Sequence, residues 1–435
     1  MRGLAAAGLG ATLCLLTPLA SRAAEPTETY VVQKGDTLYE LGRRYFVSDR
    51  DYRIVARLNG VRDPRRLQAG AVLKVPTRLL RLRQVEARVA GFKGQVTATV
   101  GGRTVPLTRG AMITEGAVIA TGANAFLRLD LPDGSQLSIP SQSRIRLGRM
   151  QEVEMTGVVR RELEVQRGRL ESEVVPLRNQ EDSYTVRTPM SVSAVRGTEF
   201  GVSYDEAAGR SGTEVIEGLV MVSQGAQSAS IPAAQGALSG AAGVNGPLPL
   251  PPPPKVPAAG KVQDETTVAF AVEGSETSGS YQVRLATDAG FVDVLEDTTA
   301  SGPEVGFGAL PDGVYFLRLA SIDPSGLIGM PATYAFERRL NTLELGQPAA
   351  SREGNLRRYK FRWKAGGDGQ RTYRLQLVRN GEETPVVDEG GLTMQELTVT
   401  DLPAGVYHWR VMSRTYARGS YVEKWSSPER FEIGH

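Results

Sequence analysis

The sequence predicts a multidomain, mainly β protein, and three observations support this fold class. The chain has 435 residues, which is too long for one hydrophobic core and corresponds to about three domains. It is rich in turn-forming residues, with 49 Gly and 25 Pro, while aromatic residues make up 6%, as is typical of short strands joined by turns. Apolar and polar residues alternate over most of residues 88–225, and the C-terminal part of the chain repeats itself.

The first element is an export signal. Arg2 precedes an apolar run over residues 4–20, and Ser21-Arg-Ala23 fits a small-x-small cleavage site. We therefore expect residues 1–23 to be a signal peptide that is cut after Ala23. Retention as an uncleaved membrane anchor is the alternative.

Cleavage changes what the mature chain can do. It removes Cys14, the single cysteine, and with it any disulfide, thiol nucleophile or cysteine metal site. It also removes Arg2 and Arg22, which leaves 49 basic residues against 48 acidic ones and gives no reason to expect nucleic acid binding. Beyond the signal, no apolar run approaches the ~20 residues that a membrane-spanning helix needs.

Residues 28–76 predict a short strand, a Gly-Asp turn, two small helices and a second short strand. Thr37 and Glu40 have capping-box spacing, so the first helix is expected to begin at Thr37. Its apolar face consists of Leu38, Leu41 and Tyr45. A second helix after Ser48 has an apolar face of Tyr52, Val55 and Leu58.

This segment resembles a LysM domain, a bacterial module that binds the glycan of peptidoglycan. The resemblance is carried by Lys34-Gly-Asp-Thr-Leu38, by Leu58-Asn59 and by Leu67-x-x-Gly70, while residues 49–53 are more charged than the family usually shows. It implies a βααβ fold, and a shallow groove whose backbone groups hold N-acetylated sugars. The glycan-binding residues that it implies are Gly35, Asp36, Thr37, Leu38, Leu58, Asn59, Leu67 and Gly70.

The same module is strongly basic. These arginines could attract the carboxylates of peptidoglycan stem peptides or the phosphates of an outer-membrane glycolipid, or they could form a solvated face balanced by Asp49, Asp51 and Asp63. The residues concerned are Arg43, Arg44, Arg50, Arg53, Arg57, Arg62, Arg65 and Arg66.

Residues 88–225 predict an antiparallel β roll or sandwich. Gln95–Val100 alternates, turns at Gly101-Gly102 and continues to Leu107, which predicts a hairpin. Leu127, Leu129 and Leu131 lie on one face of a later strand. Further strands are expected over residues 163–165, 170–175, 184–187, 199–204 and 214–222.

This region resembles a FecR domain, known from regulators of iron-siderophore uptake. The resemblance is carried by Tyr184-Thr-Val-Arg-Thr-Pro189, Val195-Arg-Gly-Thr-Glu-Phe200 and Val215-Ile-Glu-Gly-Leu-Val220. Arg196–Glu199 could be a partner-binding loop. We favour a structural interpretation, in which Gly197 permits a bulge, Arg196 pairs with a carboxylate and Phe200 enters the core.

Residues 226–260 are expected to be a linker. Ala, Gly, Ser and Gln dominate as far as Gly246, which predicts a flexible segment. The proline run over residues 247–254 favours polyproline II and predicts a semi-rigid spacer.

The chain then repeats itself, so residues 262–338 and 343–433 are expected to be two copies of one β-sandwich. Tyr281-Gln-Val-Arg-Leu corresponds to Tyr373-Arg-Leu-Gln-Leu, and two Leu-Pro-x-Gly turns, at Leu310 and Leu402, each lead into an alternating strand. The second copy resembles a fibronectin type III domain through Phe361-Arg-Trp363 before Tyr373. Phe270 takes the Trp position in the first copy.

We find no catalytic, metal or cofactor site. The two histidines, His408 and His435, have no His or Cys neighbour at metal-ligand spacing. Alternation places the pairs Glu162/Glu164 and Glu171/Glu173 on exposed strand faces rather than across a cleft, as a glycosidase would require. We expect no enzyme activity and no cofactor.

These observations predict an exported, non-enzymatic protein of the bacterial periplasm or cell envelope. Its LysM domain would bind peptidoglycan, and its other domains would present surfaces to an envelope protein. The partner site is expected in a loop formed by Tyr416, Arg418 and Tyr421, although Tyr421 and Trp425 could instead cover the sandwich end. A periplasmic regulatory or sensing protein is the alternative, followed by a cell-wall hydrolase.

Overall fold

A computed structural model describes residues 25–273 and 279–434. The predicted signal peptide, Cys14 and His435 lie outside these residues. The chain divides into two units: one runs up to Arg83 and includes Glu152–Val158, and the other holds Gln84–Gln151 and the chain from Val159 onward. The mainly β, multidomain fold class is confirmed. In the described ranges, no helix is long and apolar enough to cross a membrane.

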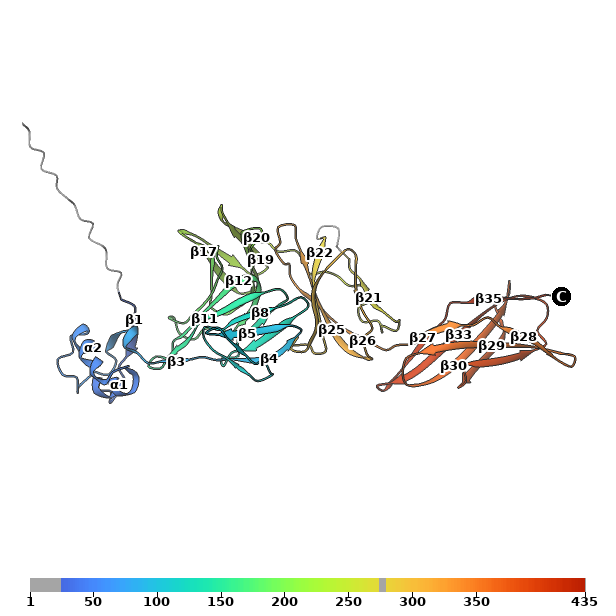
Figure 1. The fold of residues 1–435 in the computed structure, drawn as a ribbon, viewed down its shortest axis with the longest axis horizontal. Helices are drawn as coiled ribbons and strands as arrows, with labels where there is room; N and C mark the ends of the chain where they lie inside the picture. The colour runs from blue at the N-terminus through green and yellow to red at the C-terminus, as the bar shows by residue number, and fades with distance from the viewer. Residues whose placement is uncertain (1–24, 274–278, 435) are drawn as a thin grey trace, which may run out of the picture. The chain divides into compact units, whose positions relative to one another are not determined.

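The first unit has the predicted order of strand, helix, helix and strand (Figure 1). The strands β1 and β2 pair antiparallel, and both helices lie between them in the chain. The elements are β1 (Thr27–Val31), α1 (Leu38–Tyr45), the 3-10 turn η1 (Asp49–Asp51), α2 (Tyr52–Leu58), β2 (Val72–Pro76) and the 3-10 turn η2 (Thr77–Leu79).

Helix α1 begins where the sequence predicted. Thr37 is extended, and its Oγ1 accepts a hydrogen bond from the backbone N–H of Glu40 at 3.1 Å, so it caps the helix. Leu38 and Leu41 are buried, as expected. The prediction for Leu58 was wrong, because α2 ends there with its buried face at Val55 and Ala56, which leaves Leu58 53% exposed.

The core of this unit contains a segment from far along the chain. Val153, Met155 and Val158 pack with Leu79 and Leu80 in the same apolar cluster as the two helices. They belong to residues 152–158, between two long strands, and sequence periodicity gave no sign of this contact.

The second unit begins with two sheets around one core. The first sheet contains β5 (Val96–Val100), β6 (Arg103–Val105), β8 (Val118–Thr121), β11 (Arg144–Val153), β13 (Ser183–Arg187), β14 (Val192–Val195), β17 (Leu219–Gln224) and β18 (Gln227–Pro232). The second contains β4 (Ala87–Lys93), β7 (Met112–Ile113), β9 (Phe126–Asp130), β10 (Gln136–Ile139), β15 (Thr198–Asp205), β16 (Arg210–Glu217), β19 (Gln235–Gly240) and β20 (Gly243–Pro249). The short strand β3 (Leu82–Gln84) precedes them in the chain.

One long strand, β12 (Val159–Val174), belongs to both sheets. Its first half pairs with β13 and its second half with β15 and β10. Gly168 stands between the halves with φ +75°, and a Cβ there would lie 2.6 Å from the Cα of Ser143, so only glycine permits this corner. The β12–β13 pairing is parallel, which corrects the expectation of a purely antiparallel domain. The predicted β5–β6 hairpin is confirmed.

The expectation of a flexible linker over residues 226–260 was wrong. Residues 227–249 form β18, β19 and β20. Their small side chains reflect close packing: a Cβ on Gly236 would lie 2.9 Å from Leu250 and 3.0 Å from the carbonyl of Thr213. The proline run is not a free spacer either, because the carbonyl of Pro254 accepts a hydrogen bond from Tyr334 at 2.7 Å.

Two β-sandwiches follow, as the repeat predicted. The first has β21 (Val268–Ala271) paired with β24 (Glu304–Phe307), facing a sheet of β23 (Val294–Ser301), β22 (Ser280–Ala286), β25 (Gly313–Ile322) and β26 (Ala332–Arg338). The second has β27 (Thr342–Leu345), β28 (Ala349–Glu353), β29 (Leu356–Gly366) and β32 (Glu396–Thr400), facing β31 (Pro385–Leu392), β30 (Gln370–Arg379), β33 (Gly405–Ala417), β34 (Ser420–Trp425) and β35 (Glu429–Ile433).

The two copies share one tyrosine contact. Tyr315 donates a hydrogen bond to the carbonyl of Pro311 at 2.7 Å, and Tyr407 donates to that of Pro403 at 2.8 Å. Both bonds span four residues from the Leu-Pro-x-Gly turn into the following strand, as in a tyrosine corner. Phe270 and Trp363 are both buried in their cores.

Candidate functional site

The turn before α1 lies against the loop before β2. The N–H of Leu38 donates to the carbonyl of Pro64 at 2.9 Å, and the N–H of Gly70 donates to that of Val32 at 2.8 Å. Gly35 and Gly70 are exposed, and a Cβ on either would meet no atom within 4 Å. Two backbone segments thus form neighbouring walls with open space beside them.

The predicted glycan-binding residues differ in their burial and in their hydrogen bonds. Asp36 closes its own turn, accepting hydrogen bonds from the Tyr30 hydroxyl at 2.8 Å and the Gln33 N–H at 2.7 Å. Leu38 is fully buried and its N–H donates to the carbonyl of Pro64, so both its side chain and its N–H serve the fold. Leu67 packs against the core. Gly35 and Gly70 are exposed and Thr37 is half-buried, so these three residues remain candidates for contact with a glycan.

Asn59 fastens α2 to β2 instead of facing the turn. Its amide donates to the carbonyls of Val55 and Lys74, both at 2.8 Å, and its oxygen accepts from the N–H of Lys74 at 2.8 Å. Both amide protons are therefore used within the fold. Asn59 therefore stabilises the end of α2, directly after the exposed Leu58.

The motif Val195–Phe200 combines a structural and an interdomain role. Phe200 is buried and makes an edge contact with Tyr184, with ring centroids 6.2 Å apart. Arg196 donates to the backbone carbonyls of Asn179 and Gln180, both at 2.8 Å, which corrects the expected carboxylate pair. Glu199 forms an ion pair with Arg318 of the first sandwich at 3.0 Å.

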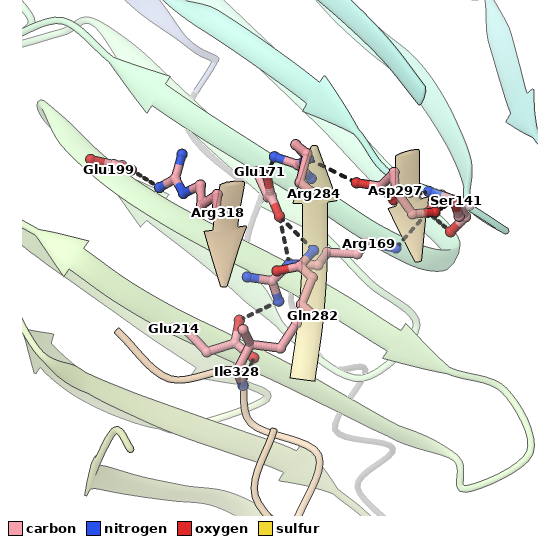
Figure 2. Close-up of polar contacts among 11 residues, drawn as sticks. Ser141, Arg169, Glu171, Glu199, Glu214, Gln282, Arg284, Asp297, Arg318 and Ile328 are labelled. Carbon is pink, nitrogen blue, oxygen red and sulfur yellow. Dashed lines mark hydrogen bonds and ion pairs between the residues drawn. The ribbon is translucent and has the colours of Figure 1, made fainter. Parts of the chain in front are cut away.

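That ion pair belongs to a seam of charged side chains between the second sheet (β12, β15 and β16) and the first sandwich (Figure 2). Arg284 lies at its centre, with Nη1 2.9 Å from Glu171 and Nε 2.8 Å from Asp297. Gln282 donates to the other oxygen of Glu171 at 3.0 Å. Glu171 is therefore an interdomain anchor, which corrects its placement on an exposed face.

The seam continues on both sides of Arg284. Arg169 reaches Glu214 at 2.8 Å, and Glu214 also accepts the N–H of Ile328 at 3.2 Å. On the other side, Ser141 donates to the carbonyl of Asp297 at 2.5 Å. The Arg284 guanidinium also lies 4.6 Å from the ring centroid of Phe126.

Comparison with known families assigns two of these regions. The LysM domain family matches residues 30–76, and the family described as FecR protein matches residues 117–221. Residues 30–76 are a LysM domain. Residues 117–221 are a FecR domain. No curated protein matches the sequence.

Solved structures also resemble parts of the chain. Two structures of a candidate anti-sigma factor from Parabacteroides distasonis ATCC 8503 are 17% and 19% identical, each with a TM-score of 0.25, and the match covers 29% of this chain and 57% of theirs. The chain thus spans little more than half the length of that protein. The C-terminal region resembles the fibronectin III-like modules of CbhA from Clostridium thermocellum (11% identity, TM-score 0.20, 41% of this chain and 90% of that one). A cytokine receptor complex is also similar (16%, TM-score 0.25, 41% and 95%).

The LysM domain carries an aromatic pair that sequence reasoning missed. The rings of Tyr39 and Tyr52 lie 4.4 Å apart, their hydroxyls are 3.3 Å apart, and Arg53 donates to the Tyr52 hydroxyl at 3.3 Å. Hydrogen bonding to Arg53 lowers the pKa of Tyr52, and hydrogen bonding to Tyr52 raises that of Tyr39. Tyr39 belongs to α1, directly after the buried Leu38, and the positive charge of Arg65 acts on both tyrosines.

Two acidic residues among the LysM arginines accept hydrogen bonds from backbone N–H groups. Asp51 accepts a hydrogen bond from the backbone N–H of Ser48 at 3.3 Å, and Asp63 accepts one from that of Arg65 at 3.0 Å. Both carboxylates keep their charge, but residues 28–76 hold 10 Lys and Arg against 6 Asp and Glu, so the domain is basic.

Charge in the FecR seam centres on Glu171. Burial opposes the ionisation of Glu171, but the charges of Arg284 and Arg169 outweigh this and hold its pKa well below the usual range. Burial raises the pKa of Glu214, although Arg169 opposes the effect. Glu171, which faces two guanidinium groups, is thus the ionised anchor of the seam.

The predicted partner hairpin is exposed, but its tip forms hydrogen bonds with other parts of the chain. Tyr416 and Tyr421 are 48% and 68% exposed, with ring centroids 4.8 Å apart, so Tyr421 does not cover the sandwich end. Arg418 donates to the carbonyl of Asp312 at 3.4 Å, and Arg339 donates to Ser420. The tip therefore contacts the first sandwich, while the two tyrosines face solvent.

Proposed function

We propose that this chain is a non-enzymatic envelope protein that is exported, held to peptidoglycan by its LysM domain, and presents its C-terminal domains to a protein partner. The observation that carries the proposal is the pair of hydrogen-bonded backbone segments around Gly35 and Gly70 within a recognised LysM domain. LysM domains bind peptidoglycan, and LysM and FecR domains are typical of bacterial envelope proteins.

The groove suits a neutral, amide-bearing sugar. Such a ligand needs fixed N–H and C=O partners and a small apolar floor, with no metal and no charged catalyst. The exposed glycine backbones supply the polar groups, and the adjacent rings of Tyr39 and Tyr52 supply apolar area. We therefore propose a narrower set than the sequence predicted, without Asn59 and the Leu38 side chain, whose contacts and burial serve the fold.

A wall-degradation assay tests the non-enzymatic part of the proposal. The full chain is incubated with dye-labelled peptidoglycan and run on a zymogram, with lysozyme as the positive control. We expect binding without release of dye and without clearing. Clearing by the purified chain would identify it as a cell-wall hydrolase instead.

The basic surface should add a salt-sensitive component to wall binding. We expect the affinity for peptidoglycan to fall about three- to tenfold between 0.1 M and 1 M NaCl, because the screening length shortens from about 10 Å to about 3 Å. The double variant Arg53→Gln, Arg65→Gln should lose most of this salt dependence while keeping the high-salt affinity. Equal salt dependence in both proteins, measured by co-sedimentation, would show that these arginines form only a solvated face.

A further inference from the structure

The second sandwich exposes a sheet face that the first sandwich uses for docking. On β30 and β33, alternate residues point inward to the core, so the residues between them point outward. We call this outward surface the β30–β33 face. It carries Arg374, Gln376, Arg410 and Arg414, the aromatic residues Tyr416, Tyr421 and Trp425, and Glu423, which forms an ion pair with Arg414.

Strand register shows that the two faces are equivalent. In the first copy Arg284 of β22 pairs with Arg318 of β25. In the second copy Gln376 of β30 pairs with Arg410 of β33. Arg284 and Gln376 each lie three residues after the first tyrosine of their strand. Arg318 and Arg410 each lie three residues after the tyrosine that bonds the Leu-Pro-x-Gly turn. Arg410 thus occupies the position of Arg318.

The first copy shows what this face binds. Gln282, Arg284 and Arg318 meet the carboxylates of Glu171 and Glu199, on neighbouring strands of the FecR domain (Figure 2). An aromatic ring, Phe126, lies under the Arg284 guanidinium. The bound surface is a β-sheet that offers carboxylates to guanidinium groups.

In the second copy the same positions face solvent. The side chain of Arg374 is 44% exposed and pairs with Asp388 on its own sheet. Arg410 donates to Gln376 at 3.0 and 2.8 Å, and its guanidinium lies 4.4 Å from the ring centroid of Trp425. Where Arg318 has a carboxylate from another domain, Arg410 has a neutral amide. Like the docked face, this face carries guanidinium groups, with Arg410 at the position of Arg318 and Arg374 at that of Gln282, while Gln376 replaces the central Arg284. Its extra aromatic residues are typical of interface anchors.

We propose that the β30–β33 face binds a protein that presents an acidic β-sheet surface, in the way that the first sandwich binds the FecR domain. The inference rests on the proposed function, in which the C-terminal domains serve an envelope partner. It also moves the partner site from the hairpin tip to the sheet. Tyr416 and Tyr421 form one edge of the site, while Arg418 contacts the first sandwich.

Site-specific photo-cross-linking in the full chain tests the inference. The probe is the full protein with p-benzoylphenylalanine in place of Gln376, irradiated in envelope extract, and cross-linked peptides are identified by mass spectrometry. The control carries the same amino acid in place of Thr398, which is exposed on β32 of the opposite sheet. We expect an adduct from position 376 only, joined to a β-strand of another protein whose outward residues include Asp or Glu.

A charge reversal completes the test. The adduct yield should fall about tenfold or more when Arg374→Glu and Arg410→Glu are added, with only a small drop in the thermal transition, because the Arg374–Asp388 pair that the reversal breaks is exposed. An adduct in a carboxylate-free segment, an adduct with a second copy of this chain, an undiminished yield in the reversed protein, or no protein adduct would each overturn the inference. Retention on peptidoglycan is measured in parallel: loss of retention would count against the proposed function, whereas retention without an adduct counts against this inference alone.

Discussion

Replacing Thr37 by Trp in the full chain is expected to weaken peptidoglycan binding about tenfold or more in Kd. Thr37 lies in the turn that forms one wall of the LysM groove, next to the loop that contains Pro64. An indole at this half-buried position would occupy the space that the sugar needs, while the backbone of Gly35 and Gly70 would keep its conformation. Co-sedimentation with insoluble peptidoglycan over a range of protein concentrations measures the effect.

Thr37→Ala is the matched control. It removes the hydroxyl that caps α1, at a cost of about 1 kcal/mol to the helix, without adding bulk to the groove. We expect its affinity to stay within about twofold of that of the native chain. If Thr37→Ala weakens binding as much as Thr37→Trp, the loss comes from folding. If Thr37→Trp binds normally, the 35–38 turn is not a wall of the glycan site.

Replacing Arg284 by Ala is expected to give the largest loss of stability in the second unit. The Arg284 side chain is 5% exposed and forms ion pairs with Glu171 and with the buried Asp297. Its removal leaves the buried Asp297 carboxylate without a cation and takes one of two guanidinium groups from Glu171, which costs about 3–5 kcal/mol. Denaturant unfolding followed by circular dichroism should show an early transition for the FecR domain and the first sandwich, separate from the tryptophan fluorescence of the second sandwich, which holds Trp363, Trp409 and Trp425.

The repeat supplies a control for this variant. Arg374 also pairs with an aspartate on the neighbouring strand, through two hydrogen bonds of 2.6 Å to Asp388, but both side chains are substantially exposed. Arg374→Ala should therefore cost about 1 kcal/mol or less. Equal effects of the two substitutions would mean that the FecR seam is open in solution. Such a result would also weaken the analogy between the two sheet faces.

Local signals in the sequence determined much of this fold. The cap of α1 needs only a hydroxyl three residues before a backbone N–H. The β5–β6 hairpin needs Gly101-Gly102 between two alternating strands. The two sandwiches repeat the same Leu-Pro-x-Gly turn. Each feature depends on residues within a few positions of one another. The LysM and FecR motifs were recognisable for the same reason.

Tertiary structure alone decided the rest. The composition of residues 227–249 indicated flexibility, but their small side chains are needed where β19 packs against Leu250 and β16. Arg284 and Glu171 are 113 positions apart, and neither has a local pattern that distinguishes a buried ion pair from a solvated charge. Val153 and Met155 complete the LysM core from a distant hairpin. Sequence periodicity identifies which face of a strand is apolar, but the partner that covers a polar face depends on contacts between segments far apart in the chain.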